Sequence, residues 1–258
     1  MLSEGGDVYS MIEDKVLADR TMYDDLTVIY LAAVQTTQIS VNNLMKYLHM
    51  DANTAVLEKL VQEVDSLLAF DVWDASGSHV NHEALREACS YENIQDGFDY
   101  TMMCFRESMR IEPPVGLTTA HKVIKDAVLA RGTAKELKVR AGDEIHLMNT
   151  ILHHDEAQWG ANHNEFIPER FDSNSKYFMA PDGKHRHPYS YAPFLGGHRI
   201  CLGKTFAENV AKRMISMVLK FYALEHADAE MKQETFAYDL FQIKLPSIHY
   251  KFAKRLPR

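Results

Sequence analysis

Residues 191–208 read YAPFLGGHRICLGKTFAE and place a single cysteine, Cys201, in a glycine-rich turn just before a strongly helical run. Glycines such as Gly197 and Gly203 adopt backbone angles closed to other residues and let a bulky group approach the chain closely. Arg199 supplies a fixed cation that suits a carboxylate or a phosphate. A thiolate is the useful form of cysteine, as nucleophile or metal ligand, and the start of a helix favours it. The stretch therefore predicts a functional site.

Two interpretations of such a cysteine compete. A lone cysteine is usually a small buried hydrophobe, and this is our prediction for Cys89 and Cys104, which lie in helical runs. Around Cys201 the thiolate, the space beside the glycines and the cation of Arg199 together suggest a haem with its propionates. A zinc site is an alternative with no typical ligand spacing, and its ligands would be His185, His187, His198 and Cys201.

The same stretch also partly matches a phosphate-binding loop, G-x-x-x-x-G-K-[ST]. Gly203, Lys204 and Thr205 fit the end of that motif, but its first glycine should stand where the chain has His198. A phosphate loop also follows a buried strand, whereas residues 187–195 contain two prolines and little strand pattern. A nucleotide-binding enzyme is therefore a weaker alternative.

One family resemblance accounts for the whole stretch. Phe194, Gly197, Arg199, Cys201 and Gly203 match all five fixed positions of F-x-x-G-x-R-x-C-x-G, which resembles the haem-binding signature of the cytochrome P450 family. The resemblance implies a mainly α fold with a small β region. It implies that Cys201 is the axial thiolate on the iron of haem b, a ligand that favours O–O cleavage. It also implies that Arg199 pairs with a haem propionate.

Further family elements occur upstream in the expected order. Glu107 and Arg110 are three residues apart on a helix predicted over 98–111, which two prolines end. Arg170 lies downstream in FIPERF. The resemblance implies that the three side chains form a buried ion network that ties the loop before Cys201 to this helix. The alternative is three solvated surface charges.

A long helix predicted over 23–50 carries AAVQTT at residues 32–37. This resembles the family's small-small-x-acid-Thr-Thr segment, and implies that Thr36 and Thr37 serve oxygen activation and proton delivery. Gln35 stands where the family usually has Asp or Glu. An amide orients water but does not titrate, so we predict that Gln35 lowers the coupling of oxygen activation to product formation.

Two sets of basic residues have open interpretations. Many relatives have an arginine soon after the two prolines that reaches a propionate, whereas this chain offers His121, either as a weak substitute or as an ordinary strand residue. On the helix after Cys201, a basic patch could dock an electron donor, or it could be a solvated helix face. Its members are Lys204, Lys212 and Arg213.

The implied function is that of a haem-iron monooxygenase. Such an enzyme activates dioxygen and inserts one oxygen atom into a small organic substrate, with electrons from an NAD(P)H-dependent reductase or a ferredoxin. The resemblance runs from about Asp7 to the end and covers the C-terminal portion of a family member. We therefore expect residues 1–258 to be a single partial domain without the N-terminal helices, whose long helix exposes an apolar face. A truncated, catalytically inactive remnant, with or without haem, is the alternative.

Composition narrows the partners and the location. The 258 residues include 36 acidic and 28 basic side chains, a net charge of −8 that argues against a nucleic-acid partner. Three cysteines without a CxxC pair fit a reducing, intracellular compartment. No apolar run reaches the length of a membrane span, and the first residues do not form a secretory signal. We expect a cytoplasmic or membrane-associated protein with no anchor in this chain.

The remaining elements follow from apolar spacing and breakers. A helix is predicted over 53–70 with Asn53 as N-cap, and another from about Leu202 to Leu224. Residues 115–154 mix short β-prone runs with glycine turns, and residues 153–197 read as a polar loop that includes His153 and His154. Alternation of Ile248, Tyr250 and Phe252 predicts a C-terminal strand.

Overall fold

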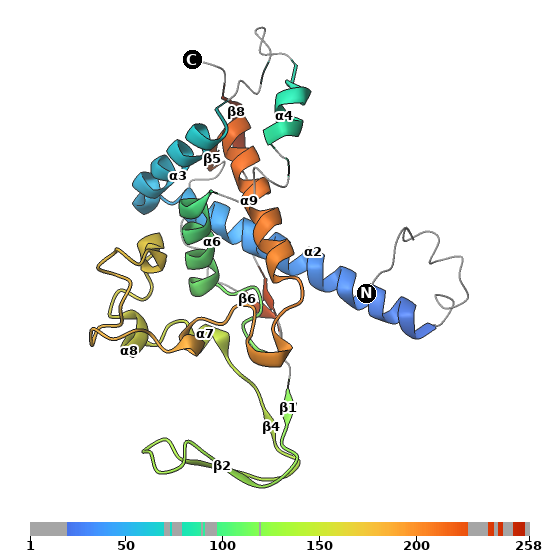
Figure 1. Cartoon of the computed structure of the whole chain (residues 1–258), viewed down its shortest axis with the longest axis vertical. Coiled ribbons are helices and arrows are strands. Elements are labelled where there is room, and N and C mark those ends of the chain that lie inside the picture. Colours follow the sequence, from blue (N-terminus) through green and yellow to red (C-terminus); the bar gives the residue numbers. More distant parts are fainter. Residues whose placement is uncertain are drawn as a thin grey trace.

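The computed structural model describes residues 20–69, 73, 79–88, 90, 97–118, 120–226, 237–239, 242–244 and 250–255. This part of the chain is mainly α, as the sequence predicts (Figure 1). Its α-helices are α2 (Arg20–Leu48), α3 (Thr54–Leu67), α4 (His82–Ala88), α6 (Asp99–Ile111), α7 (Asn149–Leu152), α8 (Glu156–Trp159) and α9 (Lys204–Phe221). Short 3₁₀ turns are η2 (Asp51–Asn53), η3 (Pro168–Phe171), η4 (Pro188–Ser190) and η5 (Gly197–Arg199).

The described strands form small antiparallel pairs. In chain order they are β1 (His121–Lys122) with β4 (Glu144–Ile145), β2 (Ala127–Leu129) with β3 (Leu137–Val139), β5 (Tyr222–His226) with β8 (Tyr250–Lys254), and β6 (Ala237–Asp239) with β7 (Gln242–Lys244). The predicted C-terminal strand is present as β8, in which Phe252 lies opposite Leu224. Ile248 lies outside the described residues.

Two predictions at helix ends are met only in part. Asn53 is the N-cap residue of α3, as predicted, but its side chain makes no capping hydrogen bond, and its Nδ2 instead donates to the Tyr47 carbonyl at 2.8 Å. This donation satisfies a carbonyl at the end of α2, so tertiary contact decides the role of the amide. Helix α9 ends at Phe221, and Leu224 belongs to β5, because the chain turns into a strand that β8 covers.

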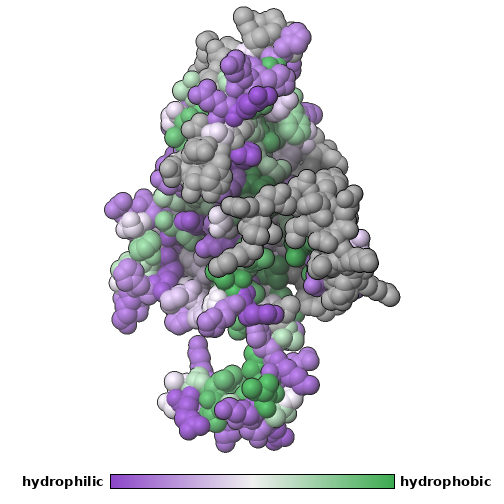
Figure 2. All heavy atoms as spheres, turned by 45° about the vertical axis from the view of Figure 1, so that its right-hand side comes forward, coloured by the Kyte–Doolittle hydropathy of each residue, from purple (hydrophilic) through white to green (hydrophobic). Residues whose placement is uncertain are grey.

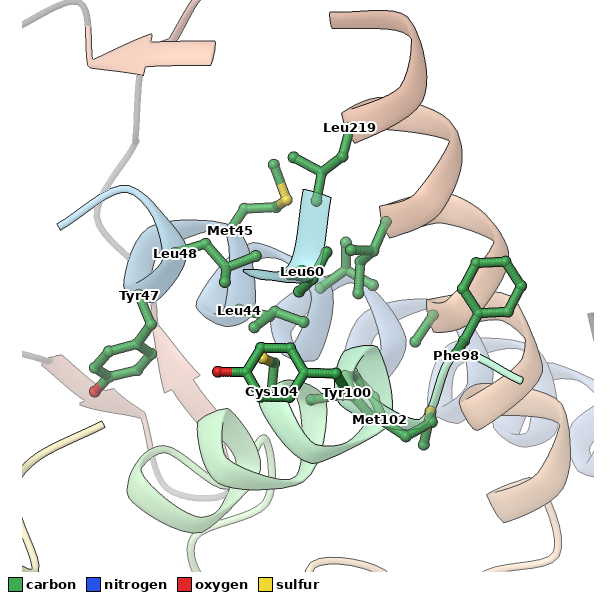
Figure 3. Close-up of a cluster of buried hydrophobic side chains, with 14 of the residues drawn as sticks. Leu44, Met45, Tyr47, Leu48, Leu60, Phe98, Tyr100, Met102, Cys104 and Leu219 are labelled. Atoms are coloured by element: carbon green, nitrogen blue, oxygen red, sulfur yellow. The ribbon is translucent and has the colours of Figure 1, made fainter. Parts of the chain in front are cut away.

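The core forms where the C-terminal half of α2 meets α3, α6 and α9 (Figure 3). Leu44 and Leu48 of α2, Leu60 of α3 and Ile215 of α9 are completely buried there. Cys104 of α6 lies among them, as predicted for a small hydrophobe, and burial raises the pKa of its thiol. Cys89 lies outside the described residues.

The N-terminal half of α2 is different, since it extends away from this core (Figure 1). The predicted apolar exposure is confirmed, although the poor solubility or association expected from it stays a prediction. No described helix is long and apolar enough to cross a membrane. The large hydrophobic residues exposed on this half are Tyr23, Leu26, Val28, Ile29, Tyr30, Leu31 and Val34.

Candidate functional site

Cys201 is exposed in the loop between η5 and α9. Its backbone N–H donates to the carbonyl of Phe194 at 2.9 Å, and Phe194 packs against the core. Two residues between them have left-handed backbone angles, Leu195 with φ 62° and Gly197 with φ 65°. Glycine takes that conformation freely, whereas a leucine is strained there, and such strain tends to occur at functional sites. The loop is thus bent into a fixed shape that presents the thiol outward.

The surroundings of the thiol fit a haem. Leu202 is 95% exposed and Phe206 is 61% exposed, so two apolar side chains that are close to Cys201 in the sequence are open to solvent. Arg199 is also exposed, and no ion pair engages its guanidinium within the described residues. A Cβ on Gly203 would lie 3.9 Å from the Cys201 sulfur, so the glycine keeps that flank open. The site therefore offers a soft sulfur donor for the iron, exposed apolar side chains for the haem ring and a guanidinium for its carboxylates.

Glu107, Arg110 and Arg170 are buried and bonded to one another. The Glu107 carboxylate accepts from Arg110 Nε at 2.8 Å and Nη2 at 2.9 Å, a bidentate pair within α6. Arg170 Nε, from η3, donates to the same carboxylate at 3.2 Å. Their side chains are at most 1% exposed, so they are not solvated surface charges. Burial raises the pKa of Glu107 and the two arginines oppose that rise.

The guanidinium groups of Arg110 and Arg170 also donate hydrogen bonds to backbone carbonyls. Arg110 donates to the carbonyl of His153 at 2.9 Å and to that of Glu165 at 3.2 Å. Arg170 donates to the carbonyls of Trp159 at 2.8 Å and of Asn162 at 2.7 Å. The network therefore fixes the irregular segment from 153 to 170 against α6.

Arg186 has a similar role that sequence reasoning missed. Its guanidinium donates to the carbonyls of Gln158 at 2.8 Å and Phe178 at 2.6 Å, and lies 4.4 Å from the ring centre of Trp159. Burial lowers the pKa of Arg186 to about 10, and the nearby charge of Arg170 adds to this. A lone arginine in GKHRHP carries no sequence signal for this contact.

His153 is completely buried, so the prediction of a polar loop residue is wrong. Its Nε2 accepts the backbone N–H of Ala192 at 2.9 Å, and its ring stacks on Tyr191 with centroids 5.4 Å apart. Because its carbonyl accepts from Arg110, His153 links the ion network to the start of the loop that carries Cys201. Burial lowers the pKa of His153 to about 3.

This linkage predicts a pH dependence of stability. A histidine whose folded pKa lies below its unfolded value contributes stability that is lost as pH falls from about 6.5 towards 3, at up to about 1.4 kcal/mol per pH unit. His153→Gln keeps an acceptor for Ala192 but does not titrate, so its free energy of unfolding should fall less steeply in that window. Urea unfolding across pH checks this. The exposed His82→Gln should keep the wild-type slope, and equal slopes in all three proteins would contradict the assignment.

The predicted oxygen-side residues lie near the middle of α2, before the buried stretch that begins at Ser40. Thr36 Oγ1 donates to the Ala32 carbonyl at 2.6 Å, Gln35 is exposed and Thr37 is half-buried. His121 is exposed in β1, opposite Ile145. Within the described chain, no hydrogen bond or ion pair joins any of them to Cys201, so their predicted roles stay predictions.

A second buried carboxylate fixes α2 on α6. Glu112 accepts from Lys46 Nζ at 2.7 Å and from the Tyr47 hydroxyl, and its carbonyl accepts from Asn43 Nδ2 at 3.2 Å. Burial raises the pKa of Glu112, and Lys46 opposes that rise. The helix with the oxygen-side segment is thereby anchored to the helix with the ion network.

The basic residues after Cys201 face different surroundings. Lys204 and Arg213 are exposed on α9. Lys212 is half-buried and lines a cavity of about 310 Å³ together with Arg106 and Glu208. A docking role for these cations stays a prediction.

The zinc and phosphate-loop alternatives are both wrong. No group of three or more potential ligands among the described residues could hold a metal ion, and the four proposed zinc ligands are all within that set. Residues 186–203, all described, contain only 3₁₀ turns and irregular backbone, so the strand that a phosphate loop requires is missing before α9.

Comparison with known proteins gives the family. The family model described as Cytochrome P450 matches residues 8–252. The chain is 33% identical over 233 residues to Cytochrome P450 52-N1 of Starmerella bombicola, covering 88% of this chain and 40% of that protein. It is 28% identical over 212 residues to Putative cytochrome P450 CYP13A7 of Caenorhabditis elegans, covering 82% and 35%. Taurochenodeoxycholic 6 alpha-hydroxylase of Sus scrofa is 34% identical over 129 residues, covering 50% and 23%. The chain thus spans 40% or less of the length of these relatives.

Proposed function

Because the chain belongs to the cytochrome P450 family, we propose that it binds haem b through the Cys201 thiolate and serves a monooxygenase reaction on a small organic substrate. The observation that carries the proposal is the exposed thiol in a loop fixed by the Phe194 carbonyl. A relative from Sus scrofa that is named as a hydroxylase supports insertion of oxygen as the reaction class.

Each residue has a proposed part in binding or proton handling. Bound haem would supply iron that activates dioxygen when reduced. Arg199 would pair with a propionate, and Cys201 would hold the iron. Thr36 Oγ1 holds a proton that it shares with the Ala32 carbonyl, and it is the proposed source of protons on the oxygen side. The Gln35 amide would orient water there without exchanging a proton.

Electrons would come from a separate reductase or ferredoxin. The exposed cations Lys204 and Arg213 on α9 are the proposed docking surface, since opposite charges steer such encounters. Gln35 in place of an acid favours a second candidate, a haem-binding remnant without turnover.

One spectrum tests haem binding. The purified chain is loaded with haem, reduced and exposed to carbon monoxide. A red-shifted Soret band, the mark of a thiolate ligand, is expected. If the chain takes up no haem, the proposal that it serves a monooxygenase reaction is wrong. Turnover with a reductase then separates the monooxygenase from the non-catalytic remnant.

The departure at Gln35 has a test of its own. Gln35→Asp should raise the ratio of product to peroxide, because a carboxylate can relay protons that an amide cannot. The matched control is Gln38→Asp, which adds the same charge at another exposed position of α2. If the ratio is the same in wild type and Gln35→Asp, the amide does not limit coupling.

A further inference from the structure

A cavity of about 310 Å³ lies where α6, η3 and α9 meet. Figure 1 shows α6 beside α9. The volume is at the lower end of the range for small-molecule sites. The cavity therefore has room for a ligand of about the size of an amino acid.

Two opposite charges without partners line this cavity. Arg106 belongs to α6 and Glu208 to α9, and both side chains are half-buried. Neither side chain makes a hydrogen bond or an ion pair within the described chain. A partly buried charge is costly when it loses water without gaining a counter-charge. The cavity thus leaves one positive and one negative group open for a ligand.

The rest of the lining suits a short apolar group beside a charged head. Its apolar surface comes from Met102 and Met103 of α6 and from Phe171 of η3. Methionine is unbranched and adapts to the shape of a neighbouring group. Lys212 and Asp99 add one more charge of each sign, so the charges of the lining cancel. A ligand without net charge therefore matches this cavity.

We propose that this cavity binds a small zwitterion of the α-amino acid class with an apolar side chain. The Arg106 guanidinium would donate two parallel hydrogen bonds to the ligand carboxylate, and the Glu208 carboxylate would accept from the ligand ammonium group. The apolar side chain of the ligand would lie against the two methionines and Phe171. The ligand would bridge α6 and α9, and its binding requires neither haem nor turnover.

Other ligand classes fit this lining less well. A simple anion would meet the carboxylates of Glu208 and Asp99, and a metal ion would meet the cations of Arg106 and Lys212. A wholly apolar molecule would leave Arg106 and Glu208 without partners. Hydropathy alone marks no such site, since hydrophobic patches and hydrophilic side chains are interspersed on the face in Figure 2.

Calorimetric titration with L-leucine and two analogues tests the need for both ligand charges. The full chain should bind L-leucine at one site. It should bind 3-methylbutylamine, which lacks the carboxylate, and 4-methylpentanoate, which lacks the ammonium group, about tenfold or more weakly. If the chain binds no leucine, or binds all three compounds equally, the proposal is wrong.

Two variants assign each ligand charge to its side chain. Arg106→Gln should lose the preference for leucine over 3-methylbutylamine and keep the preference over 4-methylpentanoate, and Glu208→Gln should do the reverse. The controls Arg86→Gln and Glu83→Gln remove exposed charges of α4 and should bind leucine as the wild type does. If either cavity variant keeps both preferences, leucine binds elsewhere and the proposal is overturned. Circular dichroism checks that each variant keeps its helices, and the analogue titrations on the unaltered chain do not depend on the variants.

Discussion

Replacing Cys201 with serine is expected to abolish the red-shifted Soret band of the reduced, carbon monoxide-bound protein and, with it, all turnover. A serine hydroxyl does not ionise near neutral pH and is a hard donor, so it cannot replace the thiolate on haem iron. Cys201 is exposed, and its side chain makes no hydrogen bond among the described residues, so the fold should survive the substitution. Absorption spectra and circular dichroism of the same preparation check both expectations.

The matched control is Cys104→Ser. Cys104 is buried in the core, so a hydroxyl there should lower the free energy of unfolding by about 1–3 kcal/mol while the Soret band keeps its position. The two substitutions should therefore have different effects. Cys201→Ser should change the spectrum, and Cys104→Ser should lower stability. A red-shifted band that persists in Cys201→Ser would mean that another side chain holds the iron.

Glu107→Ala is expected to lower the free energy of unfolding by about 3–5 kcal/mol, because it leaves Arg110 and Arg170 buried without their counter-charge. Both arginines donate hydrogen bonds to backbone carbonyls between 153 and 170, so this segment should unfold first. Urea denaturation measures the loss, and limited proteolysis locates it.

Two further variants sharpen this test. Glu58→Ala removes an exposed carboxylate of α3 and should change stability by less than about 0.5 kcal/mol. Glu107→Gln keeps the shape and one acceptor oxygen while it removes the charge, so its loss should lie between the other two. If Glu107→Ala is as stable as Glu58→Ala, the network does not hold this part of the fold together.

The regular elements were predictable from local sequence. Apolar spacing marks α3, α6 and α9, and the two prolines after Glu112 mark the end of α6, because these signals depend on neighbours along the chain. The proximity of Glu107 and Arg110 follows from helical spacing. Arg170 was assigned to them only through the family resemblance, since it lies 63 residues beyond Glu107.

The irregular segment after α6 was not predictable in the same way. His153 and Arg186 stand among polar residues, and no periodic pattern separates a buried histidine from an exposed one. Their environment depends on the path of the backbone, which places carbonyls and an aromatic ring around them. Asn53 shows the same limit, because its position before α3 is visible in the sequence but the donation from its Nδ2 to the Tyr47 carbonyl is not.

The segment from 158 to 178, whose backbone carbonyls accept hydrogen bonds from Arg170 and Arg186, should tolerate residue replacements better than insertions or deletions. Surface loops commonly accept insertions, whose entropic cost grows slowly with length. Here Arg170 and Arg186 bond to carbonyls of Trp159, Gln158 and Phe178, and every amino acid supplies a carbonyl. Many residue replacements would keep these bonds, whereas one added or deleted residue between 159 and 178 would move carbonyls out of register. The number of residues in this stretch is therefore under stronger constraint than their identity.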